Sequence, residues 1–280
     1  MTALPPASSL PPIAFIGGGN MASAVLGGLR RAGLAADRFE VVEPFADTRE
    51  RLAADHGVNA LSAAGDALQR CALVVWAVKP QVFAQAASAT RPFLPPLALH
   101  LSVAAGIPSG SIAQWLGTER VIRAMPNTPA LVGQGTTGLY ARPAVDAGGR
   151  AQAEQLLAPT GRLLWVNEES ALDAVTALSG SGPAYVFYFI ESMVEAGLEM
   201  GLTPEQAHQL AVGTFTGASA LAASASEAPA TLRERVTSKG GTTHAAITSL
   251  EAARVKDQFK TAIRAAQQRA RELAQEFGGA

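Results

Sequence analysis

Short apolar runs alternate with amphipathic stretches along the first half of the chain. Ile13–Ile16 is a continuous apolar run that ends in glycines, which is typical of a strand buried on both faces of a parallel sheet. Asn20–Arg31 has apolar residues at helical spacing and stops before Gly33. A charged helix is predicted at 48–56, and further strands at Phe39–Val42, 72–78, 97–103, 121–124, 136–141 and 162–166. The alternation indicates an α/β fold with a doubly wound, Rossmann-type parallel sheet.

Strand patterns stop after Glu168, and the second half is predicted to be all-α. Residues 185–200 form a helix that is apolar around almost its whole circumference, so it must be buried. A small helical domain has too little core to cover it, so we expect a partner subunit and at least a homodimer. Further helices are expected from Thr203-Pro204-Glu205, over 244–250, and as one long amphipathic helix over 250–277. The expected organisation is a proline-rich disordered tail (1–12), a dinucleotide-binding domain (13–166) and a helical dimerisation and substrate-binding domain (167–280).

Composition and charge exclude several classes of protein. The 280 residues carry 22 Lys and Arg against 23 Asp and Glu, a net charge of −1, which does not suit nucleic acid or an anionic membrane surface as a partner. No apolar run is long enough for a membrane helix, and we expect no secretory signal at the start. A single cysteine, Cys71, excludes an internal disulfide and fits a reducing compartment such as the cytoplasm. No P-loop or HExxH motif occurs.

A glycine-rich loop follows the first predicted strand and opens the first predicted helix. Gly17, Gly19 and Ala22 match the GxGxxG/A pattern, in which glycines let the backbone approach a pyrophosphate at a helix N-terminus. Glu43 lies about 20 residues further on, where an acid can bind the ribose hydroxyls of NADH and repel a 2′-phosphate. Arg49 can serve a 2′-phosphate if its side chain reaches back. The alternatives are a glycine turn with no ligand and a solvated Glu43.

Other predicted strands also end in residues suited to binding. The third long strand ends in Val78-Lys79-Pro80 and the fifth in Met125-Pro126-Asn127. Because ligands of open α/β sheets bind beyond the carboxyl ends of the strands, these segments predict a ligand site at one edge.

A second glycine-rich segment, Thr237-Ser238-Lys239-Gly240-Gly241-Thr242-Thr243, precedes a predicted helix. Backbone N–H groups of such a turn can converge on a carboxylate. The alternative is an ordinary helix start with Thr242 or Thr243 as the capping residue.

Taken together, the motifs resemble pyrroline-5-carboxylate reductase over about residues 13–275. The matching segments are Phe15-Ile16-Gly17-Gly18-Gly19-Asn20-Met21, Ala77-Val78-Lys79-Pro80, Arg123-Ala124-Met125-Pro126-Asn127-Thr128-Pro129-Ala130, Leu178-Ser179-Gly180-Ser181-Gly182-Pro183-Ala184-Tyr185 and Val236-Thr237-Ser238-Lys239-Gly240-Gly241-Thr242-Thr243. The resemblance implies reduction of the cyclic imine 1-pyrroline-5-carboxylate to L-proline, the last step of proline biosynthesis, with NADPH or NADH. It also implies a homodimer with interleaved helices, with larger assemblies of dimers in some members, and no metal.

The resemblance carries roles onto particular residues of this chain. Thr243 is expected to hydrogen-bond the imine nitrogen as the catalytic residue, beside a substrate-binding set of Ser179, Ser181, Gly240, Gly241 and Thr242. The expected cofactor-binding residues are Gly17, Gly18, Gly19, Asn20, Met21, Glu43, Ala77, Val78, Lys79, Pro126 and Asn127. Two positions depart from the family pattern: Lys239 replaces a frequent proline, and Glu43 replaces the small or polar residue of NADPH-preferring members.

Three alternatives stay open at this point. One is a reductase of another cyclic imino acid. A second is a β-hydroxyacid-type dehydrogenase, although residues 185–200 lack the lysine that such enzymes often place on the helix after the domain junction. The third is a dinucleotide-binding regulator without turnover. Oxidation of NAD(P)H in the presence of pyrroline-5-carboxylate separates them.

Overall fold

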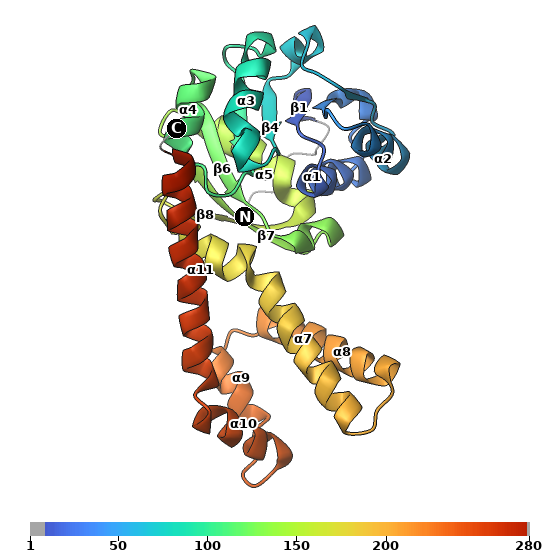
Figure 1. The fold of residues 1–280 in the computed structure, drawn as a ribbon, viewed down its shortest axis with the longest axis vertical. Coiled ribbons are helices and arrows are strands. Elements are labelled where there is room, and N and C mark those ends of the chain that lie inside the picture. Colours follow the sequence, from blue (N-terminus) through green and yellow to red (C-terminus); the bar gives the residue numbers. More distant parts are fainter. Residues whose placement is uncertain (1–8, 279–280) are drawn as a thin grey trace. The chain divides into compact units, whose positions relative to one another are not determined.

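A computed structural model describes residues 9–278 and shows a sheet of eight strands in the order β3-β2-β1-β4-β5-β6-β7-β8 (Figure 1). The strands are β1 (Ile13–Ile16), β2 (Phe39–Val42), β3 (Ala60–Leu61), β4 (Leu73–Trp76), β5 (Leu99–Ser102), β6 (Val121–Met125), β7 (Gly135–Ala141) and β8 (Gly161–Trp165). The first six are parallel. From β1 the sheet grows outward through β2 and β3 on one side and through β4, β5 and β6 on the other. The strand order therefore reverses between β1 and β4, and the crevice beyond these two strands is the expected ligand position of a doubly wound sheet.

Helices cover both faces of this sheet, as the predicted alternation requires. Apolar side chains of α1 (Asn20–Arg31), α2 (Ala46–His56) and α5 (Ala147–Leu157) form one core with β1, β2, β4 and β6. Helices α3 (Pro80–Thr90) and α4 (Ser109–Leu116) form the second core on the opposite face. The predicted Rossmann-type fold is therefore confirmed.

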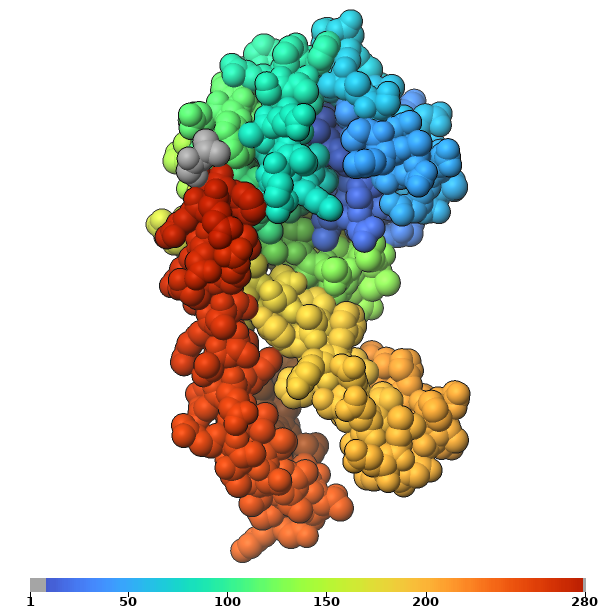
Figure 2. Space-filling view, in the orientation of Figure 1, coloured from blue at the N-terminus to red at the C-terminus, as the bar shows by residue number. Residues whose placement is uncertain are grey.

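The contacts divide the chain into two compact units. One contains residues up to Gly180 together with those from Ala266, and the other spans Ser181–Ala265. The first unit includes α6 (Ala171–Val175), a π-helical turn (Thr176–Gly180) and the end of α11, drawn in dark red against this unit in Figure 2. Leu273 and Phe277 of α11 lie beside Gly106 in the β5–α4 loop. The expected domain boundaries at 13–166 and 167–280 stay a prediction.

The second unit is helical, as expected. It contains α7 (Gly182–Glu199), α8 (Pro204–Ser224), α9 (Pro229–Arg235), α10 (Thr242–Ala252) and the start of α11 (Val255–Gly278). Thr203 and Gln206 form a capping box at the start of α8, which confirms the helix start predicted at Thr203-Pro204-Glu205. Among the residues that the structure describes, no helix has the length and apolar character to cross a membrane.

The structure differs from the expected fold in several details. Strand β7 pairs antiparallel with β6, so the sheet is mixed rather than wholly parallel. The two-residue strand β3 was not predicted. The long helix expected over 250–277 is present, but it begins at Val255, because α10 continues to Ala252 and Arg254 takes a left-handed conformation with φ +54° between the two helices. Residues 1–8 of the expected disordered tail lie outside the described range, but Leu10 in its last part is fully buried in the core.

Candidate active site

The glycine loop is held tightly against the neighbouring strand ends. Gly17 has φ +95°, a conformation that side chains rarely adopt. A Cβ on Gly17 would lie 2.6 Å from the Ala77 carbonyl oxygen, so only glycine allows the loop to pass the end of β4. The Gly17 N–H also donates to the Val42 carbonyl at the end of β2 (2.8 Å). The loop is therefore positioned by both flanking strands, at the crevice expected for a dinucleotide.

The start of α1 has the features that a pyrophosphate requires. Gly19 is the N-cap residue, and no side chain caps the helix, so the first N–H groups of α1 are left for a ligand. A Cβ on Gly19 would meet no atom within 4 Å, so the space in front of this residue is open. Asn20 is exposed at the first turn, whereas Ala22 is buried and keeps the helix close to the sheet. These residues fit a dinucleotide.

Glu43 braces the glycine loop from the end of β2. Its carboxylate accepts from the Gly18 N–H (2.8 Å) and from the Phe45 N–H (2.9 Å). Only 6% of Glu43 is exposed, so the alternative of a solvated acid is wrong. Each carboxylate oxygen keeps a lone pair that can accept from a ribose hydroxyl. Glu43 thus fixes the loop backbone as well as lying where the ribose is expected.

Arg49 reaches back from α2 to the segment that follows β2. Its Nη1 donates to the backbone carbonyl oxygens of Glu43 (3.0 Å) and Pro44 (2.7 Å). Its remaining guanidinium N–H groups have no partner within residues 9–278, which leaves them for a ligand. The Arg49 side chain thus reaches back to the segment after β2, and its binding of a 2′-phosphate stays a prediction.

The end of β6 is joined to the segment that carries Ser179. The Asn127 side chain accepts from the Thr136 N–H (2.8 Å) and donates to Ser179 Oγ (3.2 Å), and Ser179 Oγ donates to the Thr136 carbonyl (3.2 Å). Ser179 lies in the π-helical turn, an irregularity that often marks a functional position. Because the Ser179 hydroxyl hydrogen is committed to Thr136, this side chain is better placed to accept a hydrogen bond than to donate one.

The remaining cofactor candidates of the first unit line the same edge. Lys79 is exposed at the N-terminus of α3 and follows Ala77 and Val78, which are half-buried. Pro126 is buried and Met21 half-buried. The structure thus brings together the glycine loop, Glu43, the end of β4 and the end of β6.

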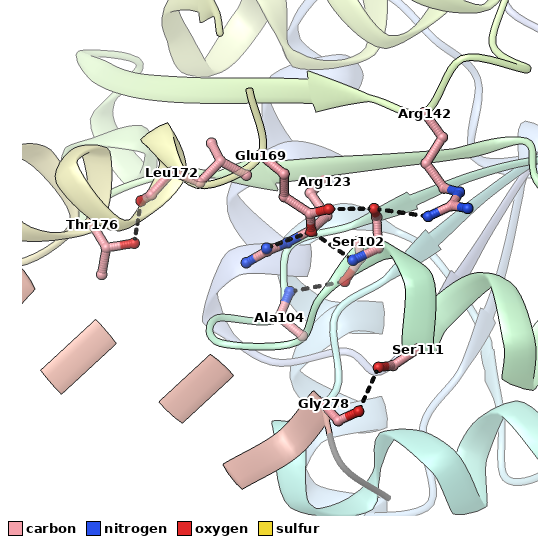
Figure 3. Close-up of polar contacts among 10 residues, drawn as sticks. Ser102, Ala104, Ser111, Arg123, Arg142, Glu169, Leu172, Thr176 and Gly278 are labelled. Atoms are coloured by element: carbon pink, nitrogen blue, oxygen red, sulfur yellow. Dashed lines mark hydrogen bonds and ion pairs between the residues drawn. The ribbon is translucent and has the colours of Figure 1, made fainter. Parts of the chain in front are cut away.

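A partly buried ion pair joins Arg123 on β6 to Glu169 (Figure 3). Glu169 accepts from Arg123 Nη1 (2.7 Å), from the Ser109 N–H (2.6 Å) and from the Ser109 hydroxyl (2.6 Å). Burial by itself raises the pKa of the Glu169 carboxyl, but these hydrogen bonds outweigh it and lower that pKa below its usual value. The pair joins β6 and α4 to the segment that leads into Ser179. Sequence reasoning missed it, although an arginine inside an apolar strand is a signal for a buried partner.

The second glycine-rich segment lies in the second unit and has its own geometry. Gly240 has φ +78°, and a Cβ on Gly241 would collide with the Ser238 side chain. Gly241 is the N-cap of α10, so the alternative in which Thr242 or Thr243 caps this helix is wrong. Neither hydroxyl makes a hydrogen bond within the described residues, and the first N–H groups of α10 are open. Ser181 lies just before α7 in the same unit.

Metal ligands do not gather at either place. Within residues 9–278 no group of three or more His, Cys, Asp or Glu side chains is arranged to hold a metal ion.

Two family models match the chain. Residues 12–106 match the model described as NADP oxidoreductase, coenzyme F420-dependent, and residues 169–273 match the one described as pyrroline-5-carboxylate reductase dimerisation. With the dinucleotide-binding geometry described above, these matches define an NAD(P)-dependent oxidoreductase with a dimerisation domain.

Relatives extend the match to almost the whole chain. A pyrroline-5-carboxylate reductase of Pseudomonas aeruginosa is 45% identical over 96% of this chain and 99% of its own length. A solved pyrroline-5-carboxylate reductase from Coxiella burnetii is 36% identical, with a TM-score of 0.88 over 95% of this chain and 99% of that one. The Plasmodium falciparum pyrroline carboxylate reductase, solved with NADP bound, is 27% identical, with a TM-score of 0.83 over 94% and 98% of the two chains. The chain belongs to the pyrroline-5-carboxylate reductase family.

Proposed function

We propose that this chain reduces 1-pyrroline-5-carboxylate to L-proline with NADPH or NADH. One observation carries the proposal: a chain of this family has two uncapped helix N-termini suited to anions. One is at the glycine loop before α1, where a dinucleotide is expected, and the other is at Gly240–Thr243 before α10. The reduced nicotinamide supplies a hydride to the imine carbon, and the ring nitrogen takes a proton. The product is a secondary amine, and the cofactor leaves oxidised.

The substrate carboxylate is assigned to the N-terminus of α10. The N–H groups of Thr242 and Thr243 lack helix partners there, and the positive end of the helix dipole favours an anion. Gly240 and Gly241 leave no side chain between this backbone and a ligand. Ser181 is assigned to the same pocket and completes the substrate-binding set.

Thr243 is proposed to bind the imine nitrogen through its hydroxyl. This hydroxyl is free within the described residues and half-exposed, so it can face a substrate held by the adjacent N–H groups. A protonated imine is already electrophilic, so the site needs to orient the ring more than to activate it, and orientation alone can contribute several kcal/mol. A water molecule supplies the net proton in this proposal, because a threonine hydroxyl is a weak acid.

The cofactor is assigned to the strand edge of the first unit. The pyrophosphate is assigned to Gly17–Asn20 and Met21. The adenosine ribose is assigned to Glu43 and Arg49. The nicotinamide half is assigned to the ends of β4 and β6, with Ala77, Val78, Lys79, Pro126 and Asn127. Ser179, which accepts a hydrogen bond from Asn127, is proposed as a further substrate-binding residue. We expect both cofactors to bind, since Glu43 suits a free ribose hydroxyl and Arg49 suits a 2′-phosphate.

Assembly and location complete the proposal. Helix α7 leaves large apolar side chains exposed in the single chain, including Phe187 at 63%. A second copy is the proposed cover, giving a homodimer in which residues 167–280 serve dimerisation and substrate binding and 13–166 bind the cofactor. Larger assemblies of dimers are also proposed. The single, buried Cys71 supports a cytoplasmic location.

The test is oxidation of NADPH and of NADH with pyrroline-5-carboxylate and with its six-membered analogue. Turnover with the five-membered ring, and weaker turnover with the six-membered ring, supports the proposal. Tight cofactor binding without oxidation of either substrate would support a regulator instead.

A further inference from the structure

A small cavity lies at the amino-terminal edge of the sheet, where the chain enters β5 and β6. The candidate cofactor site lies beyond the carboxyl ends of the same strands, so the two places are on opposite edges. The cavity has a volume of about 260 Å³. Its lining residues are Arg91, Leu94, Pro95, Pro96, His100, Leu116, Gly117 and Thr118.

His100 presents a hydrogen-bond donor to this cavity. It lies on β5 and is only 3% exposed, and its Nδ1 accepts from the Trp76 indole N–H at 3.1 Å. Burial lowers the pKa of His100 to about 4, and the positive charge of Arg120 lowers it too, so the ring is neutral at pH 7. Since Nδ1 accepts a hydrogen bond, the ring proton is on Nε2.

This Nε2–H is left without a partner by the residues that the structure describes. No hydrogen bond to it occurs within residues 9–278. The fully enclosed polar side-chain atoms without a partner in that range are Arg38 Nε, Arg120 Nε and Thr137 Oγ1, and His100 Nε2 is not one of them. The nitrogen therefore reaches open space, and the cavity that His100 lines is the space beside it.

Arg91 adds an uncompensated positive charge to the same cavity. Its guanidinium lies over Gly117, so close that a Cβ there would collide with it. Within the described residues Arg91 makes no ion pair, and the cavity lining contains no acidic side chain. Thr118 Oγ1 accepts from the Arg120 N–H (3.2 Å), which leaves its own hydroxyl hydrogen to donate. The cavity thus offers donors and one cation, but no anion.

We infer that this cavity is a second ligand site, for a small monocarboxylate with a compact apolar body. The carboxylate would accept from His100 Nε2–H and from the Arg91 guanidinium. The walls from Leu94, Pro95 and Leu116 would contact its carbon skeleton. The volume is below the roughly 300–1,000 Å³ of pockets for drug-sized ligands, so the occupant is small. One lining cation, Arg91, among otherwise neutral side chains suits a monocarboxylate better than a phosphate dianion. The inference does not rest on the reductase activity.

The test uses the Trp76 indole as the reporter. The protein with ¹⁵N-labelled tryptophan gives indole signals from Trp76, Trp115 and Trp165, and it is titrated with cyclopentanecarboxylate, which has a five-membered ring and no amine. We expect the Trp76 signal to shift, because its indole donates to the histidine that binds the ligand. The Trp165 signal should stay, because its indole donates to Glu154.

Two matched arginine variants locate the ligand. Arg91→Gln should raise the dissociation constant about tenfold or more, since it removes a charge-assisted hydrogen bond. Arg162→Gln, an exposed arginine on β8, should leave it unchanged. Neither variant should change turnover of the main reaction.

Three results would overturn the inference. One is no Trp76 shift, or an equal shift in Arg91→Gln and the parent. A second is equal binding of inorganic phosphate, which would refute the carboxylate selectivity. The third is loss of the shift in Thr243→Ala, which would show that the signal reports the proposed catalytic pocket rather than this cavity.

Discussion

The ion pair between Glu169 and Arg123 supports the strand end that carries the proposed nicotinamide site. Replacing Glu169 by alanine removes a carboxylate that accepts three hydrogen bonds of 2.6–2.7 Å. It also leaves the Arg123 guanidinium buried without its partner, since this residue is almost fully enclosed on β6. We therefore expect Glu169→Ala to destabilise the fold.

The size of the effect follows from the burial of the two groups. Removing one partner of a fully buried ion pair costs about 3–5 kcal/mol. The Glu169 side chain is 26% exposed, and Asp173 lies close enough to Arg123 to offset part of the lost attraction. We expect about 2–3 kcal/mol, which corresponds to a fall in Tm of roughly 5–10 °C for a chain of this size.

The control is Glu119→Ala, which removes the partner of Arg142 from an ion pair whose carboxylate is 61% exposed. An exposed pair of this kind contributes about 0–1 kcal/mol. Both variants are compared with the parent by thermal and urea unfolding at one protein concentration, because a dimer's stability depends on concentration.

The pH dependence gives a second check on the same contact. The hydrogen bonds hold the pKa of Glu169 below its ordinary value of 4.5 in the folded state. The stability that ionised Glu169 contributes to the fold is therefore complete above pH 4.5, the pKa of this group in the unfolded chain. It is lost as the pH falls below that value. The stability difference between parent and Glu169→Ala should stay constant from pH 7 down to 4.5 and shrink as the pH falls further toward the folded-state pKa. An unchanged difference, or a loss no larger than that of Glu119→Ala, would refute the reasoning.

Three further predictions concern the site and the assembly. Thr243→Ala should lower kcat/KM about tenfold or more, a loss of roughly 1.4 kcal/mol, while cofactor binding is kept and Thr243→Ser restores most of the rate; an unchanged kcat/KM removes Thr243 from the mechanism. Arg49→Gln should weaken NADPH binding about tenfold, measured by quenching of cofactor fluorescence, with little effect on NADH. Equal weakening of both cofactors would place Arg49 away from the 2′-phosphate. Phe187→Asp should convert dimer to monomer in light scattering, because it places a charge on the exposed apolar face of α7; a persistent dimer would show that this face is not the interface.

Local patterns were enough to predict the elements that build the cofactor site. The apolar run at Ile13–Ile16, the glycines and the helical spacing of Asn20–Arg31 predict the first strand, loop and helix with the same bounds that the structure has. Gly17 could be assigned to the tight turn because that role depends on its own conformation. These signals lie within a few residues of each other.

Contacts between distant segments could not be predicted in the same way. The partners of Glu43, of Asn127 and of Glu169 are set by strand register and by sequence separations of up to 60 residues. Apolar periodicity gives no strand direction, so the antiparallel pairing of β7 was missed. The break between α10 and α11 was expected at residue 250 and lies instead at the left-handed Arg254, where no glycine or proline marks it in the sequence.

The most direct test of the account follows a labelled hydride through one turnover. NADPH carrying deuterium at the transferred position of the nicotinamide C4 is mixed with the protein and pyrroline-5-carboxylate, and the product is analysed by mass spectrometry and NMR. The account predicts one proline per NADPH oxidised, with the deuterium on the former imine carbon. Cofactor oxidation without deuterium at that carbon, or no proline at all, would contradict it.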